Sequence, residues 1–259
     1  MDRSEIRATG RCGSVAVALL VVLSGGSARA VDEIQVYNAE IAPVGAFSIA
    51  QHLNYVFRGS TTPDFPGGIA SNQTLNGTPE FAYGVTDWLE LGLYAPFTVT
   101  PEGTFYSQGA KVRALAVSPN AAERKLFYGM NVELSYVTPA FSQSAAGLEF
   151  RPILGVRDLG WEAIINPIVD VSFGPYGSVQ FAPAARVARQ VTEEVWLGAE
   201  YYSNFGPFNS FDNAAGQQHS LFAVIDFVAF GVDINFGVGF GLSDPADQLV
   251  AKLILSRSF

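Results

Sequence analysis

The chain ends in Val250-Ala-Lys-Leu-Ile-Leu-Ser-Arg-Ser-Phe259. Alternate residues of this stretch form two faces. One face is mostly apolar and ends at Phe259, and the other mixes Lys252 and two serines with valine and isoleucine. Ten residues with a period of two have the length and the alternation of a transmembrane β-strand. This stretch therefore suggests a membrane barrel, which needs similar strands along the rest of the chain.

The start of the chain has the three parts of a secretory signal peptide. Three arginines lie within the first eleven residues, a short apolar run occupies 15–23, and Ala28-Arg-Ala30 forms a small-x-small exit. We therefore predict a cleaved signal peptide at 1–30, an N-terminal lead at 31–45 and an outer-membrane barrel domain at 46–259. With an export signal in place, the last strand resembles the C-terminal signal of bacterial outer-membrane barrels, and we expect the barrel-assembly machinery to bind this strand, which ends in Phe259.

Charge and cysteine content narrow the choice of function. The net charge is −9, and removal of 1–30 takes away four arginines and two acidic residues, which leaves −11. An acidic chain argues against nucleic acid as a partner, because phosphate binding needs a basic face. The single cysteine, Cys12, lies inside the predicted signal peptide, so the exported chain is expected to contain no disulfide.

Alternation continues through the remainder of the chain. In the first predicted strand, Phe47, Ile49 and Leu53 share a face opposite His52 and Asn54. This period holds for about twelve residues, longer than the five or six of an average soluble strand. Predicted strands cover 46–58, 75–84, 88–97, 105–117, 126–137, 147–157, 161–173, 179–190, 195–202, 219–228, 232–240 and 250–259. We predict an all-β, transmembrane, antiparallel up-and-down β-barrel of about 12 strands, with a range of 10–14.

The connections sort by length in the way that a bacterial barrel requires. The two longest, near 59–74 and 203–218, follow odd-numbered strands, whereas tight turns near 85–87 and 229–231 follow even-numbered ones. The short turn at 174–177 is an exception. Long loops face outward and short turns face the periplasm in such barrels. We therefore expect the outer membrane of a Gram-negative bacterium, with both termini periplasmic and membrane lipid as the surrounding partner.

Several stretches together are similar to one known family. They are VDEIQVYNAE at 31–40, QHLNY at 51–55, LNGTPEFAYGVTDW at 75–88, NPIVD at 166–170 and APAAR at 182–186. These stretches resemble the outer-membrane transporters named for the MetA pathway of phenol degradation, and the resemblance covers most of the exported chain. It implies a β-barrel that passes small, often aromatic or hydrophobic compounds. The family supplies no catalytic motif and no cofactor.

The polar faces of the strands supply candidate lumen residues. These candidates are His52, Arg58, Glu90, Lys111, Arg113, Glu133, Glu149, Arg151, Asp170, Arg186, Asp226 and Asp233. Two interpretations stay open: paired charges that fill and stiffen the lumen, or charges that line a water path. In the second case the acidic excess would favour cations or neutral solutes.

Three functions follow, and we favour the first. They are a passive channel or uptake pore for a small, unidentified solute, a sealed structural barrel, and a lipid-modifying enzyme at the barrel rim. The enzyme is the weakest, because only His52 and His219 exist; His52 points inward by alternation and His219 sits at a loop end. Ser220 adjoins His219, but neighbouring strand residues point to opposite faces. We therefore expect no enzyme activity, no catalytic site, no metal site and no cofactor.

Overall fold

The computed structural model describes residues 33–259, so the predicted signal peptide lies outside the described residues. The strands run as follows: β1 Phe47–Arg58, β2 Leu75–Gly84, β3 Leu89–Tyr94, β4 Phe97–Val99, β5 Phe105–Ser107, β6 Gly109–Val117, β7 Leu126–Val137, β8 Ala146–Asp158, β9 Trp161–Asn166, β10 Val169–Ser172, β11 Val179–Phe181, β12 Ala184–Gln190, β13 Val195–Asn204, β14 Gln218–Ala229, β15 Val232–Gly241 and β16 Leu249–Ser258. One 3-10 turn, Ala121–Glu123, lies between β6 and β7. No helix among these residues is long and apolar enough to cross a membrane.

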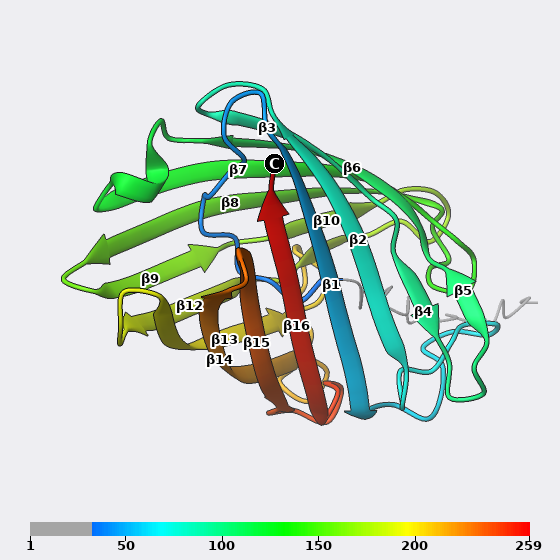
Figure 1. Ribbon diagram of the computed structural model, residues 1–259. Helices are drawn as coiled ribbons and strands as arrows, with labels where there is room; N and C mark the ends of the chain where they lie inside the picture. The colour runs from blue at the N-terminus through cyan, green and yellow to red at the C-terminus, as the bar shows by residue number, and fades with distance from the viewer. Residues whose placement is uncertain (1–32) are drawn as a thin grey trace, which may run out of the picture.

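All the strands belong to one closed antiparallel sheet. Once interrupted strands are joined, each barrel strand pairs with the barrel strands before and after it in the chain, and β1 pairs with both β16 and β2, which closes the ring (Figure 1). Four pairs of labelled strands are interrupted halves of single barrel strands: β3 with β4, β5 with β6, β9 with β10, and β11 with β12. Sixteen labelled strands therefore make twelve barrel strands, and the predicted up-and-down barrel of about twelve strands is confirmed.

Proline explains three of the four interruptions. Pro96 separates β3 from β4, Pro167 separates β9 from β10, and Pro183 separates β11 from β12. Proline has no backbone N–H to donate to a neighbouring strand, so the ladder breaks there. Pro79 and Pro152, by contrast, lie inside β2 and β8 without ending them.

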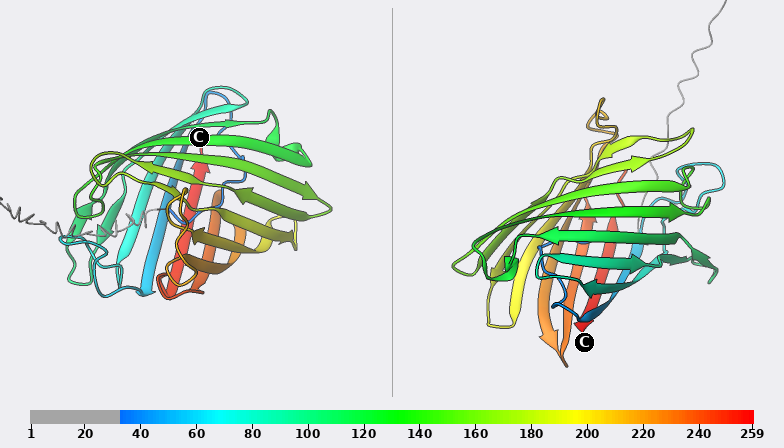
Figure 2. Two further views of the ribbon diagram at one scale, coloured as in Figure 1. Left: turned by 180° about the vertical axis from the view of Figure 1, so that it is seen from behind. Right: turned by 90° about the horizontal axis from the view of Figure 1, so that it is seen from above.

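The two ends of the barrel differ in their connections. We call one the loop end; it carries the connections 59–74, 100–104, 138–145, 173–178, 205–217 and 242–248. The other, the turn end, carries 85–88, 118–125, 159–160, 191–194 and 230–231. The chain terminates at the turn end, where the arrow of β16 finishes in Figure 1, and Figure 2 shows the same ring from two other sides. The two longest connections lie at the loop end, as the sequence predicts.

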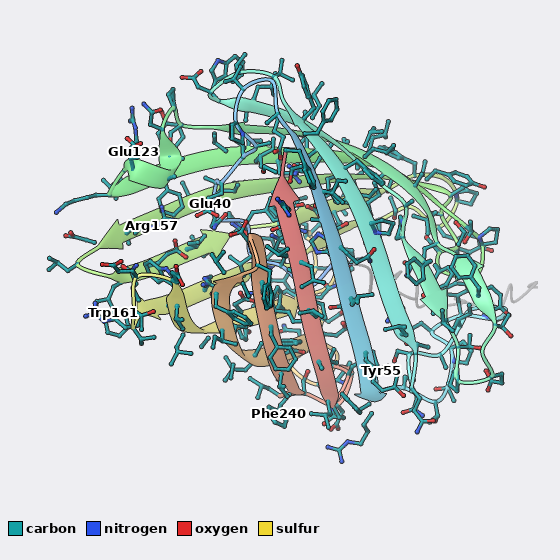
Figure 3. The ribbon with its side chains drawn as sticks, viewed as in Figure 1. Glu40, Tyr55, Glu123, Arg157, Trp161 and Phe240 are labelled. Carbon is teal, nitrogen blue, oxygen red and sulfur yellow. The ribbon has the colours of Figure 1, made fainter. Side chains whose placement is uncertain are left out.

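The two faces of the sheet have opposite character. On β1, His52, Asn54 and Val56 are buried inside the ring, whereas Phe47 and Ile49 on the outer face are 62% and 44% exposed. Large apolar side chains are exposed in the same way around the wall, among them Trp161 and Phe240, which are labelled in Figure 3. The barrel is therefore apolar outside and largely polar inside, as a bilayer requires.

Gly109, at the junction of β5 and β6, should be intolerant of any side chain. Its φ of +132° is a conformation that glycine adopts freely, and a Cβ there would overlap the carbonyl oxygen of Tyr136. We expect Gly109→Ala to lower the free energy of unfolding by about 2–4 kcal/mol. Urea unfolding in detergent, followed by heat-modifiable gel migration, measures this loss.

Gly103 is the matched control for this test. Its φ of +80° is also left-handed, but a Cβ there would meet open space. Gly103→Ala should therefore cost only the backbone term, about 1 kcal/mol. Equal losses for the two variants would show that the close approach to Tyr136 is not decisive.

Candidate functional site

The N-terminal segment runs through the interior of the barrel. We call residues 33–43 the strap. In Figure 1 it is the blue trace that passes inside the ring of strands before it joins β1. Val36, Tyr37 and Ala39 are between 2% and 5% exposed. The sequence predicts only a lead at this position, and the structure places that lead in the lumen.

The barrel wall holds the backbone of the strap by hydrogen bonds from several strands. The side-chain amide of Asn166 on β9 accepts from the Tyr37 N–H at 2.7 Å and donates to the Tyr37 carbonyl at 3.1 Å. Glu90 on β3 accepts from the Ala42 N–H at 2.6 Å. The asparagine amide thus pairs with Tyr37 as a neighbouring strand would.

Two cations of the wall hold the beginning of the strap. Arg151 Nη1 on β8 donates to the Gln35 carbonyl at 3.2 Å, and Lys252 Nζ on β16 donates to the Ile34 carbonyl at 3.0 Å. Strands β3, β8, β9 and β16 therefore all bond to the strap. These contacts satisfy the backbone groups that the strap would otherwise bury without a partner.

The strap also has an apolar side. Val36, Tyr37 and Ala39 pack in one cluster with inward apolar residues of the wall. The wall members are Leu115, Val117, Ala121, Phe127, Ile153, Ile164, Ile168 and Ala184. Burial of this surface stabilises the strap at about 25 cal/mol per Å² of apolar area. It also explains why apolar residues point inward on several strands of a barrel with a polar lumen.

The strap divides the lumen into two cavities. The cavity toward the loop end has a volume of about 350 Å³, and the cavity toward the turn end has about 620 Å³. Gln35 is the one described residue that lines both. The two cavities therefore adjoin at Gln35 of the strap.

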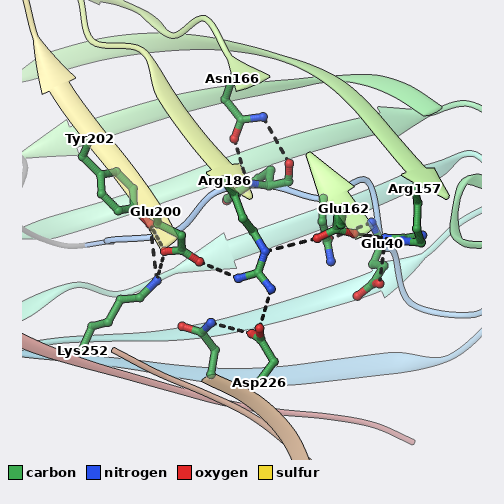
Figure 4. Close-up of polar contacts among 12 residues, drawn as sticks. Glu40, Arg157, Glu162, Asn166, Arg186, Glu200, Tyr202, Asp226 and Lys252 are labelled. Carbon is green, nitrogen blue, oxygen red and sulfur yellow. Dashed lines mark hydrogen bonds and ion pairs between the residues drawn. The ribbon is translucent and has the colours of Figure 1, made fainter. Parts of the chain in front are cut away.

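Ion pairs between strands crowd the turn-end cavity. Arg186 on β12 bonds to Glu162 at 3.2 Å, to Glu200 at 2.8 Å and to Asp226 (Figure 4). Lys252 bonds to the other oxygen of Glu200. Figure 4 shows Arg186 at the centre of this group, with side chains from separate strands converging on its guanidinium. These bonds tie β9, β12, β13, β14 and β16 together across the lumen.

A second group of ion pairs lies on another part of the wall of the turn-end cavity. Arg113 on β6 bonds to Glu80 with Nε at 3.1 Å and to Glu90 with Nη2 at 2.6 Å. His52 Nε2 on β1 lies 3.1 Å from Glu80. Glu90 also accepts from the strap, so this group joins the wall to the strap.

The loop-end cavity contains a third group. Arg151 donates two hydrogen bonds, of 2.7 and 3.0 Å, to the carboxylate of Glu149. Lys111 lies 3.6 Å from Glu133, which also accepts from the Tyr37 hydroxyl at 3.2 Å. This group therefore fastens the strap from the side opposite Lys252.

The structure brings eleven of the twelve predicted lumen residues to the two cavities. Lys111, Glu133, Glu149, Arg151 and Asp170 line the loop-end cavity. His52, Glu90, Arg113, Arg186, Asp226 and Asp233 line the turn-end cavity. Arg58 lines neither; it is exposed at the end of β1, where the register slips between Val56 and Arg58. A bulge resets the alternation that placed Arg58 inward.

The sequence did not predict the contact between the strap residue Tyr37 and the wall residue Asn166. Tyr37 lies outside any strand, so strand alternation says nothing about it. Asn166 lies in a predicted strand, but its partner Tyr37 is 129 residues away in the chain. The one feature of the sequence that could have indicated a buried lead is the alternation of polar and apolar residues within it.

Neither imidazole forms a serine–histidine pair. His219 Nδ1 lies 2.6 Å from the Tyr201 hydroxyl and its Nε2 lies 3.2 Å from Gln217. Within residues 33–259 no serine hydroxyl bonds to the imidazole of His52 or His219, and the Ser243 hydroxyl accepts only from the backbone N–H of His219 at 3.0 Å. No group of three or more His, Cys, Asp or Glu residues in the same range is placed to hold a metal ion. The absence of enzyme activity stays a prediction.

Comparison with solved structures supports the fold. The chain is similar to the COG4313 outer membrane channel from Pseudomonas putida F1, with 14% identity and a TM-score of 0.62 over 88% of this chain and 100% of that one. The translocator domain of autotransporter NalP from Neisseria meningitidis matches with 11% identity and a TM-score of 0.47, over 85% of this chain and 90% of that chain. No protein-family model and no curated protein sequence matches. The likeness to the COG4313 channel agrees with the barrel fold of this chain, and its placement among phenol-pathway transporters stays a prediction.

Loss of Asn166 should loosen the strap. Asn166→Ala leaves both backbone groups of Tyr37 without partners, which costs about 1–3 kcal/mol. The test starts from a protein with Cys12→Ser and Val36→Cys, in which position 36 of the strap has the only thiol. We expect a small thiol reagent to label this position at least tenfold faster after Asn166→Ala than before it. The labelling rate is measured by mass spectrometry of the folded protein.

Asn235→Ala controls for the loss of a partly buried lumen amide. Asn235 donates to Asp226 at 2.6 Å and bonds to no strap residue. It should leave the labelling rate close to that of the parent. Equal acceleration by both variants would contradict an anchoring role that is specific to Asn166.

Arg186 should be the most costly lumen cation to remove. Arg186→Leu leaves Glu162, Glu200 and Asp226 without their shared partner in a buried place. We expect a loss of about 3–5 kcal/mol in unfolding free energy. Arg58→Leu, at an exposed rim position, should change it by less than about 0.5 kcal/mol, and urea unfolding compares the two.

Proposed function

We propose that the protein is an outer-membrane channel for small solutes, with the strap as its constriction. The observation that carries this proposal is the pair of cavities that occupy the two halves of the lumen and meet at Gln35. A barrel without a transport role has no need for two lumen cavities of small-molecule size. The conformation described here is the narrow one, and passage requires the strap to shift.

The direction of the channel follows from its connections. Outer-membrane barrels have long loops outside and short turns in the periplasm. We place the loop end outside the cell and the turn end, with Phe259, in the periplasm. In this orientation the barrel-assembly machinery meets the C-terminal strand, and outer-membrane lipid covers the apolar wall.

The charge of the lumen favours cations and neutral solutes. The turn-end cavity is lined by nine carboxylates and three guanidinium groups, and the loop-end cavity by five carboxylates and two cations. An excess of one charge along a low-dielectric wall raises the local concentration of the opposite ion. The solute itself, including the aromatic or hydrophobic compounds that the family resemblance implies, is not identified by these charges.

A sealed structural barrel is the second candidate. The observation in its favour is the number of strands that hold the strap by hydrogen bonds, together with the apolar cluster beneath it. If these contacts never release, the two cavities stay separate. Conductance measurements distinguish the two candidates.

The channel proposal predicts discrete conductance steps from the refolded protein, without the predicted signal peptide, in a planar bilayer. Permeability should favour K⁺ over Cl⁻. Asn166→Ala should raise the open fraction severalfold because the strap loses a two-bond anchor. Glu133→Gln should lower the K⁺ preference, because Lys111 then lies beside one carboxylate fewer.

Glu123→Gln is the matched control for the charge effect. Glu123 is an exposed residue of the 3-10 turn and lines neither cavity. It should leave the ion preference unchanged. Silence from both the parent and Asn166→Ala, each shown by heat-modifiable migration to be folded, would reject the channel and support the sealed barrel.

A further inference from the structure

Asp170 in the loop-end cavity lies between two other oxygen-bearing side chains. It is directly opposite Glu149 where β10 pairs with β8, and directly opposite Gln180 where β10 pairs with β11. All three residues line the cavity. Two carboxylates directly across a strand pair repel each other, which destabilises the sheet unless a positive charge lies nearby.

The charges of the cations in this half of the lumen act on Asp170, but their nitrogens bond to other groups. Arg151 gives two nitrogens to Glu149 and the third to the Gln35 carbonyl. Lys111 lies 3.5 Å from Glu33 and 3.6 Å from Glu133. Within residues 33–259, no hydrogen bond or ion pair reaches the carboxylate of Asp170.

Gln180 independently indicates that this part of the cavity has room for a hydrogen-bond donor. Its Nε2 donates to the Ser178 hydroxyl at 3.1 Å, which turns Oε1 away from that serine. Oε1 is buried and accepts no hydrogen bond from the described residues. A buried acceptor that lacks a donor destabilises the protein by about 1–3 kcal/mol. A ligand that donates a hydrogen bond to Gln180 Oε1 removes this cost, which favours its binding.

The rest of the cavity suits an apolar body. Ile168, Phe222 and Val250 line it and are 6%, 3% and 5% exposed. Its volume of about 350 Å³ lies within the range of small-molecule sites. A bare divalent metal is a poor fit, because only two carboxylates converge and the nearby wall is apolar.

We propose that the loop-end cavity binds a small organic ammonium compound. Its charged N–H groups donate to Asp170 and to Gln180 Oε1, and its hydrocarbon part lies against Ile168 and Phe222. An ammonium group carries up to three donors, which matches the acceptors available. This inference names a solute class for the proposed channel and rests on it for transport, whereas binding is measured separately.

The test uses phenethylamine as the probe and the refolded protein in detergent micelles. Isothermal titration calorimetry against empty micelles should show saturable binding of phenethylamine. The neutral 2-phenylethanol and the anionic 3-phenylpropionate have similar apolar bodies and should bind at least tenfold more weakly. Asp170→Asn, which keeps the size of the side chain, should weaken phenethylamine binding about tenfold or more.

Two further variants make the result specific. Asp233→Asn removes a carboxylate from the other cavity and should leave phenethylamine affinity unchanged. Gln180→Leu removes the unpartnered acceptor and should weaken binding severalfold. Equal affinity for all three probes, or an Asp170→Asn variant that binds phenethylamine as the parent does, would overturn the ammonium site.

The binding and conductance measurements can fail independently. Saturable binding that depends on Asp170, in a protein without conductance, would keep the site and reject the channel. Cation conductance without phenethylamine binding would keep the channel and reject the site.

Discussion

The structure depends on the closure of β1 against both β16 and β2. In a bilayer no water can satisfy an open edge, so a sheet must close on itself to satisfy every backbone group. Closure then divides the side chains of each strand between an apolar exterior and an enclosed lumen. That interior must accommodate all the polar residues that lipid excludes, which is why so many charges lie within one narrow space.

Most of these charges neutralise one another in groups that link separate strands. Arg186 joins β9, β13 and β14, and Arg113 joins β2 and β3. The two interpretations of the polar face are therefore compatible. Paired charges stiffen the wall, while the carboxylates that exceed them give both cavities an acidic character.

The strap determines the shape of the lumen. It satisfies its backbone through wall side chains such as Asn166 and Glu90, and it buries Val36 and Ala39 against apolar wall residues. Release of a segment held in this way breaks a few hydrogen bonds and exposes one apolar cluster, but it does not open the ring of strands. This separation of a rigid wall from a releasable segment makes a gated channel physically reasonable.

The sequence by itself determined the barrel, its twelve strands and the inward position of residues such as Glu133 and Arg186. These features follow from a period of two and from turn-forming residues, which are local properties. Three features were decided only by the tertiary structure. The predicted lead lies inside the lumen, a bulge places Arg58 outside it, and particular charged residues form ion pairs with one another. Asn166 and Tyr37 are 129 residues apart, and no local pattern specifies a contact between a segment without strand structure and the far wall of a closed ring.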